Sequence, residues 1–546
     1  MALLSSALAL SGLVVPAAQA PAAATPGSAR TMPATTSGAR PAVTAAVTPA
    51  AVATPGAPAA APAARRAPLV WSQRTCSSDV RDLARDLPRP ALVECTTMRV
   101  PLDHARPAKG SITLKVTRVR SSAPGRSTRT LFVNPGGPGV AADWMAPALA
   151  AHAPELHRSH VIVAVDPRGT GGSTPADCTL ESAPVSEVRD PDAAELKALQ
   201  ASMATTVSRC VARHGRLLPH ISTAATVADM EAVRARLGAG TVDWYGVSAG
   251  TWLGARYAQT HPRRVGRIVL DSVVDITTTW RGSFAEQPRG FQRRYTRQFA
   301  PWVARHHSVY GLGATPAAVL ARIEAIRGQA VRGTLGAVTP ADLDVVIADR
   351  LYHDASFMRM AEDLSVLAEG ASDAELEQLR REAETAFDNG QGPLTAEDTV
   401  FMAVQCNDFA WSRSQSSYVE EGRRLGKAYP LIGWTWLTSP CATWPYRAKP
   451  LTPIRRHSLP AGLILQNELD PATPWRAPAG CGARRRTFGS SPWTTRARTE
   501  SSSAATPARA DRPRPTSPRA SCPRATSSAR DVRCRAKARS ARWVAS

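Results

Sequence analysis

Three features are missing from this sequence of 546 residues, and each narrows what the protein can be. Beyond its N-terminus it has no apolar run of 18 or more residues, so nothing in it predicts a membrane-spanning helix. It has no internal repeat, which argues against a solenoid or a propeller. Its last histidine is His457, so the final 89 residues cannot supply the commonest general base.

The first 66 residues contain little that could form a core. Residues 1–20 hold an apolar run ending at Ala18-Gln19-Ala20, a pattern typical of signal peptidase cleavage, although the usual basic residues before the run are missing. We expect a signal peptide at 1–20, with a disordered alanine-rich terminus as the alternative. Residues 21–66 are mostly Ala, Pro and Thr and are expected to be a disordered linker or pro-segment. The chain is therefore predicted to be secreted.

Positive charge is concentrated at the C-terminal end. Residues 476–546 contain 17 Lys and Arg against three acidic residues, a net +14 of the total +23. A basic folded surface would favour a nucleic-acid partner, but this charge belongs to a low-complexity tail, so none is expected.

Nine cysteines in a secreted chain suggest disulfides. Spacing does not prove a pairing, but six of them fall into three local pairs: Cys76 with Cys95, Cys178 with Cys210, and Cys406 with Cys441. The other three, Cys481, Cys522 and Cys534, are odd in number and lie in the tail.

Short apolar runs alternate with helical stretches over residues 67–275, a pattern typical of a mostly parallel sheet with helices on its faces. Each run is short, rich in β-branched residues, and ends at Gly, Pro or Asp. Strands are expected at 112–119, 130–134, 161–166, 242–246 and 267–271.

Residues 276–430 show no strand pattern and are predicted to be helical. Helix-start signals stand at Thr315-Pro316, Thr339-Pro340, Ser372 with Glu375, and Thr395 with Asp398. A strand signal returns at 461–466, within residues 431–475. The helical block is therefore predicted to be a lid inserted into one α/β domain, whose core is made of 67–275 and 431–475.

The strongest chemical signal is Gly246-Val247-Ser248-Ala249-Gly250, which lies between a predicted strand and a predicted helix. This is the setting of a nucleophile elbow, where a sharp turn crowds the positions two before and two after the serine. Ser248 would project from a helix N-terminus, whose N–H groups favour developing negative charge. The alternative is a structural turn.

Two further turns follow predicted strands. Asn134-Pro135-Gly136-Gly137-Pro138-Gly139 fits the glycine-rich loop that supplies a second oxyanion N–H in α/β-hydrolases. A plain tight turn or a phosphate-binding loop is the alternative, but the order does not fit Walker A and no lysine follows. The turn Asp166-Pro167-Arg168-Gly169 is interpreted as structural, with Asp166 and Arg168 fixing a loop beside the site.

The stretches NPGGPG, DPRGTGGS, YGVSAGTWLGARYA and LDPATP occur in this order, with the helical block before the last. Together they resemble the secreted tripeptidyl/prolyl aminopeptidase branch of the α/β-hydrolases, whose C-terminal part is called TAP-like. The resemblance covers about residues 69–475. It implies a Ser-Asp-His exopeptidase that cleaves peptides from free N-termini through an acyl-enzyme and uses no metal or cofactor.

The resemblance also assigns roles to residues. It implies that Ser248 is the nucleophile, that Asp470 orients the histidine, and that N–H groups of Ala249 and of the loop glycines Gly136, Gly137 and Gly139 form the oxyanion hole. In such enzymes the lid supplies acidic groups for the substrate's α-amino group. Asp408 is a candidate for that role, with a solvated carboxylate at a helix end as the alternative.

The third member of the triad is missing. Chain order in this fold is Ser, Asp, His, so a histidine is expected roughly 25 to 35 residues after Asp470, but all eleven histidines precede it. The lack of an imidazole base would cost on the order of 10^6 in kcat, or roughly 8 kcal/mol of barrier. A displaced histidine could substitute only beside Ser248, and His457 is the nearest in sequence to Asp470.

Residues 476–546 are Arg, Ala, Ser, Pro and Thr with hardly any aliphatic residue, and such a composition cannot complete an α/β domain. Out-of-frame translation of a GC-rich gene gives this residue set. Our hypothesis is a frameshift near codon 475, with the frame restored around ARDVRC. The alternatives are a disordered tail that binds an anionic polymer and an evolved pseudoenzyme.

Other functions share the same scaffold, because a fold does not fix a substrate. One is an esterase or another α/β-hydrolase acting on small substrates. An epoxide hydrolase would need an aspartate at position 248, where this chain has Ser248. A non-catalytic binding role is the third class.

Overall fold

The computed structural model describes residues 68–88, 90–123, 129–179, 187–385, 393–454 and 459–474. The predicted signal peptide (1–20), the predicted linker (21–66), His457 and the predicted basic tail (476–546) lie outside the described residues.

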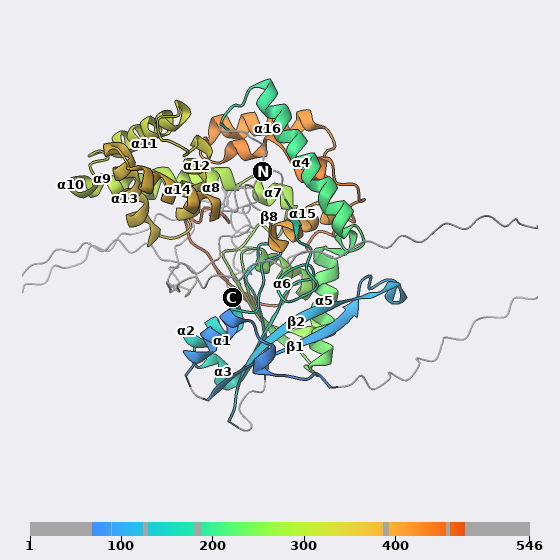
Figure 1. Cartoon of the computed structure of the whole chain (residues 1–546). Helices are drawn as coiled ribbons and strands as arrows, with labels where there is room; N and C mark the ends of the chain where they lie inside the picture. The colour runs from blue at the N-terminus through green and yellow to red at the C-terminus, as the bar shows by residue number, and fades with distance from the viewer. Residues whose placement is uncertain are drawn as a thin grey trace, which may run out of the picture. The chain divides into compact units, whose positions relative to one another are not determined.

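A seven-stranded sheet is built from the described residues, in the order β1-β2-β4-β3-β6-β7-β9. Its strands are β1 Ala91–Pro101, β2 Ser111–Ser121, β3 Arg129–Asn134, β4 His160–Val165, β6 Val242–Val247, β7 Val265–Asp271 and β9 Gly462–Leu465. β1 and β2 form a long antiparallel ribbon (Figure 1), β2 is antiparallel to β4, and every later pair is parallel. Two short strands, β5 Cys178–Thr179 and β8 Pro393–Leu394, pair separately.

All six predicted strands are present, so the prediction of a mostly parallel sheet is confirmed. Strand β1 was not predicted. Its apolar residues are mixed with Glu94, Thr97 and Arg99, because burial along this strand is incomplete. A strand of this kind lacks the continuous apolar run that marks the buried parallel strands.

Helices of the core pack on both faces of the sheet. They are α1 Ser78–Arg85, α2 Met145–His152, α3 Leu156–Ser159, α4 Ala193–His214, α5 Thr223–Arg236 and α6 Ala249–Thr260. Along β3, Leu131 and Val133 join the cluster around α2, whereas Phe132 joins the cluster that contains Trp252 and Tyr257 of α6. This alternation follows from the period of two along a strand, and it buries the sheet on both sides.

The inserted region is mostly helical, as predicted, although the short strand β8 interrupts it. Its helices are α7 Trp280–Phe284, α8 Gln287–Arg294, α9 Ala300–Arg305, α10 His307–Tyr310, α11 Pro316–Val331, α12 Pro340–Arg350, α13 Ser356–Glu369, α14 Asp373–Thr385, α15 Ala396–Asp408 and α16 Gln415–Ala428. Helices α8 to α14 share an apolar cluster of their own and group together in Figure 1. No helix in the described part of the chain is both long and apolar enough to cross a membrane.

The four predicted helix starts are confirmed by their caps. Thr315, Thr339 and Thr395 each accept a hydrogen bond from the backbone N–H three residues later. At the start of α14, the N–H of Glu375 donates to the hydroxyl oxygen of Ser372, and the N–H of Ser372 donates to the carboxylate of Glu375. Satisfying these otherwise unpaired N–H groups fixes where each helix begins.

Three disulfides join the described cysteines, in the pairs that their spacing suggested. They are Cys76–Cys95, Cys178–Cys210 and Cys406–Cys441. The last ties the C-terminal end of α15 to the segment that leads back into the core.

Candidate active site

Ser248 occupies the turn between β6 and α6. Its backbone has φ 52° and ψ −125°, a conformation that side chains other than glycine seldom adopt. A Cβ atom on Gly246 would overlap the carbonyl oxygen of Gly250, and one on Gly250 would overlap that of Asn134. Both glycines are therefore required by close backbone approach, as the elbow pattern predicts.

The elbow is held from the neighbouring strand. The backbone N–H of Ser248 donates to the carbonyl oxygen of Asp271, at the end of β7, over 3.0 Å. The side chain of Ser248 is half-exposed, whereas the flanking Val247 and Ala249 are buried. Among the described residues no side chain is hydrogen-bonded to its Oγ.

The glycine-rich loop lies directly on the elbow. A Cβ on Gly136, whose φ is 108°, would lie 2.6 Å from the carbonyl oxygen of Val247 and 2.8 Å from the nitrogen of Ala249. Gly136 and Ala249 are thus brought together. The N–H of Gly136 itself donates to Oδ1 of Asn134 over 3.1 Å, so it is already occupied. Gly139 faces Val400 of α15 instead.

Asp470 lies in a tight turn after β9. Its Oδ1 accepts the N–H groups of Ala472 at 3.0 Å and of Thr473 at 2.7 Å, and 8% of the residue's surface is exposed. Gln287 of α8 donates to the carbonyl oxygen of Ala472 over 3.0 Å, so the lid supports this turn. Both backbone bonds use Oδ1, and no donor to Oδ2 is found among the described residues.

Sheet register relates Asp470 to Ser248. Val247 of β6 pairs with Asp271 of β7, and Asp271 pairs with Leu465 of β9. All three strands are parallel, so Ser248 and the turn of Asp470 emerge at the same edge of the sheet. The carboxyl end of a parallel sheet is where such folds place their functional groups.

No histidine completes the pair within the described residues. Ten of the eleven histidines are described, and none of them is hydrogen-bonded to Ser248 or Asp470. Several have structural partners elsewhere: His104 with Asp229, His160 with Asp243, and His214 with the carbonyl oxygen of Asp177. Within the described residues the arrangement is a serine and a carboxylate without an imidazole.

Asp408 is not placed at the mouth of a site. Its carboxylate is fully buried and accepts bonds from the N–H of Thr223 at 2.9 Å, the hydroxyl of Thr223 at 2.5 Å and Nε1 of Trp280 at 3.0 Å. Burial raises the pKa of Asp408 to about 6, and these bonds and Arg256 oppose the rise. The side chain joins α15 to the start of α5, so the structure gives it a fixed internal role.

Asp166 and Arg168 fix a loop beside the site, which confirms the structural interpretation of their motif. Oδ1 of Asp166 accepts the N–H groups of Ala142 at 2.8 Å and Asp143 at 2.9 Å, just after the glycine-rich loop. Arg168 is fully buried and pairs with Asp229 at 2.7 Å. Burial and the neighbouring Asp143 raise the pKa of Asp166 to about 7, although its three backbone bonds act in the opposite direction.

One residue near the site, Glu397, belongs to none of the motifs found in the sequence. Glu397, in the first turn of α15, accepts the N–H of Ala141 at 2.7 Å through Oε1. Burial raises its pKa, and the nearby Asp398 and Asp143 add to the rise. The two partners are 256 residues apart in sequence. Only the capping signal at Thr395 and Asp398 placed a helix start here.

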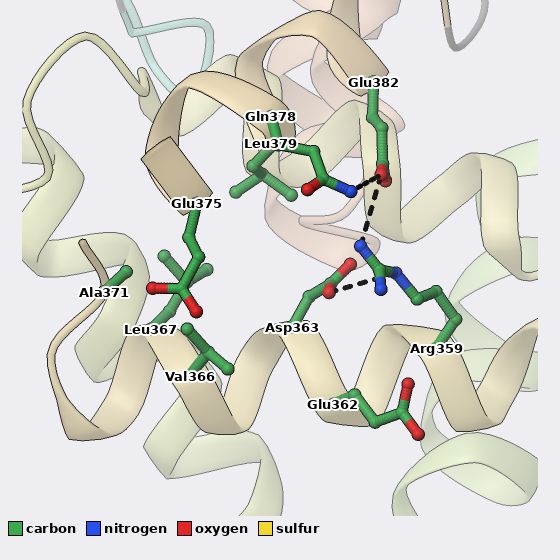
Figure 2. A pocket seen from close by; sticks show the side chains of 10 residues that line it. All are labelled: Arg359, Glu362, Asp363, Val366, Leu367, Ala371, Glu375, Gln378, Leu379 and Glu382. Carbon is green, nitrogen blue, oxygen red and sulfur yellow. Dashed lines mark hydrogen bonds and ion pairs between the residues drawn. The ribbon is translucent and has the colours of Figure 1, made fainter. Parts of the chain in front are cut away.

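A separate cavity of about 180 Å³ lies between α13 and α14, within the lid. Figure 2 shows Arg359 reaching toward Asp363 and Glu382 at this cavity. None of the predicted site residues lines it. Its lining residues are Arg359, Glu362, Asp363, Val366, Leu367, Ala371, Glu375, Gln378, Leu379 and Glu382.

Two families match parts of the chain. Residues 129–309 match the family described as alpha/beta hydrolase fold, and residues 429–505 match the family described as TAP-like protein. The first match contains the elbow and the glycine-rich loop, and the second contains Asp470. The second also extends past residue 475 into the predicted tail.

Curated relatives cover most of the chain. Tripeptidyl aminopeptidase of Streptomyces lividans is 32% identical over 438 residues, which are 77% of this chain and 79% of that protein. Serine protease Hip1 of Mycobacterium tuberculosis is 25% identical, over 70% of this chain and 77% of that protein. Carboxylesterase B of M. tuberculosis is 28% identical, over 75% and 81%.

Proposed function

The chain belongs to the α/β-hydrolases with a TAP-like segment, the group of the tripeptidyl aminopeptidases, and from this premise we propose that it is a secreted serine exopeptidase acting on free N-termini. The observation that carries the proposal is the elbow, where Ser248 stands with φ 52° at the start of α6 and beside the glycine-rich loop.

The proposed chemistry is acyl transfer. Ser248 Oγ attacks the scissile carbonyl carbon, its proton passes to a base, the amine leaves, and water then hydrolyses the acyl-enzyme. The N–H of Ala249, at the N-terminus of α6, would stabilise the oxyanion. A second donor would come from Gly137, because the N–H of Gly136 is used within the loop and Pro138 has none.

Asp470 would orient the histidine that serves as that base. With no histidine after His457 in this sequence, we infer that the chain as written is strongly impaired, on the order of 10^6 in kcat. Resequencing the gene and translating it in three frames tests the frameshift hypothesis. The hypothesis fails if no frame encodes a His-Gly turn at the expected distance after Asp470.

The test of the nucleophile is covalent labelling. We expect a fluorophosphonate probe to label Ser248, slowly in the absence of a base, and S248A to remain unlabelled under the same conditions. Tripeptide p-nitroanilides with free and acetylated N-termini then test exopeptidase activity. Equal labelling of S248A would refute the proposed role of Ser248.

An esterase acting on small substrates is the second candidate, favoured by the 28% identity to a protein called Carboxylesterase B. Asp408 is also too buried to meet a substrate's amino group. Faster turnover of p-nitrophenyl esters than of tripeptide anilides, with no preference for a free N-terminus, would favour it. A marked preference for a free N-terminus would favour the exopeptidase.

A further inference from the structure

The first turns of α15 lie on both loops that flank the elbow. A Cβ on Gly139 of the glycine-rich loop would be 2.6 Å from Cγ1 of Val400. A Cβ on Gly169, in the loop after β4, would overlap Cγ2 of the same valine. Val400 is buried, so α15 covers these two loops by direct contact and not across solvent.

Three successive N–H groups that follow the glycine-rich loop are held by two carboxylates. Ala141 donates to Glu397 at 2.7 Å, while Ala142 and Asp143 donate to Asp166 at 2.8 and 2.9 Å. Asp166 follows β4 of the core, whereas Glu397 belongs to the inserted lid. The conformation of this segment therefore depends on both parts of the chain.

Glu397 is not needed to start its own helix. The capping box of α15 is made by Thr395 and Asp398, whose side chains exchange bonds with each other's backbone N–H groups. Burial and two neighbouring carboxylates disfavour the ionised form of Glu397 and raise its pKa. The bond from the N–H of Ala141 opposes that rise, so it is the contact that favours the carboxylate at this buried position.

The contact is linked to the elbow through a short path. Ala141 directly follows Val140 in the chain. The N–H of Val140 donates to the carbonyl oxygen of Gly136 over 3.2 Å. Gly136 in turn lies against Val247 and Ala249, on either side of Ser248. Movement at Ala141 would therefore be transmitted to the loop that faces the nucleophile.

We propose that Glu397 is a positioning residue, which holds the glycine-rich loop in place through the N–H of Ala141, so that the oxyanion hole is complete only when α15 is seated. The catalytic part of this inference rests on the proposed function. The structural part concerns the loop alone.

Amide hydrogen exchange tests the structural part in the full chain. Losing one buried hydrogen bond corresponds to about tenfold in an opening equilibrium, so we expect E397A to exchange about tenfold faster over residues 139–143. Gln at this position still offers a carbonyl oxygen, so E397Q should remain within about twofold of the unmodified chain. Glu420 on α16 is exposed, and E420A is the matched control. Unchanged exchange in E397A, or an equal rise in E420A, would overturn the proposal.

Steady-state kinetics tests the catalytic part with tripeptide p-nitroanilides. Because the chain as written is expected to be strongly impaired, the variants are compared in a chimera in which residues 476–546 are replaced by the corresponding segment of the Streptomyces lividans relative. Oxyanion contacts strengthen in the transition state, so E397A should lower kcat by about tenfold with KM unchanged, and E397Q should recover it. A rise in KM at constant kcat would show that Glu397 binds substrate, and would overturn the positioning role. If this chimera cleaves no peptide, the proposed function fails, while the exchange experiment in the full chain still decides whether Glu397 holds the loop.

Discussion

The backbone of Ser248 is in a strained conformation, and contacts with neighbouring residues hold it there. A non-glycine residue at φ 52° and ψ −125° costs of order 1–3 kcal/mol. The bond from its N–H to Asp271 and the close approach of Gly246 and Gly250 keep the turn in this form. The glycines are thus as necessary as the serine, since each occupies a position where a methyl group has no room.

Replacing Gly250 by alanine should disrupt the elbow. The added methyl group would overlap the carbonyl oxygen of Asn134, and overpacking of this kind costs about 1–3 kcal/mol. Denaturant unfolding should show that loss for G250A, together with loss of fluorophosphonate labelling. A methyl group on Gly240 would meet no atom within 4 Å, so G240A should unfold like the unmodified chain. Equal stability of G250A and G240A would contradict the prediction.

Asp408 shows why the sequence alone could not assign its role. Its position at the end of a lid helix beside Cys406 suggested a group near the mouth of the site. The structure turns its carboxylate toward Thr223 and Trp280, residues that lie 185 and 128 positions earlier in the chain. No local pattern encodes contacts of that separation.

The raised pKa of Asp408 predicts a pH effect on stability. With a folded pKa of about 6 against 3.8, the folded state binds the proton more tightly than the unfolded state between these values. Stability therefore falls as pH rises through this window, by about 3 kcal/mol at most. Measured against D408N, which does not titrate, the unmodified chain should gain free energy of unfolding from pH 7 to pH 4. A constant difference would refute this.

At the level of elements, the sequence was sufficient to predict those strands and helices whose apolar pattern or capping residues lie within the element itself. The buried strands β3, β4, β6 and β7 were predicted from their apolar runs, and four lid helices from their caps. β1 was missed because polar residues interrupt its apolar residues, whereas its ribbon partner β2 is mostly buried and was predicted. Motifs made Ser248 and Asp470 candidates, whereas no motif pointed to Glu397, because its partner Ala141 lies in another part of the chain.

Helix α15 offers a test of how the lid supports the loop. T395A removes the cap of α15, which should cost about 1 kcal/mol, and it should also speed amide exchange over residues 139–143. T339A removes the equivalent capping box of α12, which has no contact with the loop in the described structure. Both variants should lose similar stability in urea, but only T395A should change exchange in the loop. The same exchange in both would show that the loop is independent of α15.

At the level of the whole molecule, the strands of the sheet are not continuous in sequence, because the lid is inserted between two of them. The lid helices lie between β7 and β9, so the turn of Asp470 forms only after the chain has returned to the sheet. Asp470 then stands at the same edge as Ser248 with no described histidine between them. The basic composition begins just after this turn.

Replacing the tail should therefore restore activity. We expect a chimera with the corresponding C-terminal segment of the Streptomyces lividans relative in place of 476–546 to gain kcat by orders of magnitude, up to about 10^6, on tripeptide p-nitroanilides. The same graft carrying S248A should stay inactive. Equal activity of the unmodified chain and the chimera would show that the present sequence already supplies a base.

Strand β9 has a further consequence for how copies of the molecule behave toward one another. In the described structure it pairs with β7 on one side, and it is the last strand of the sheet. It is only four residues long, and Leu463 is 41% exposed. An open backbone edge is a template for strand addition. We therefore expect that any strand added to the described sheet on this side would pair with β9.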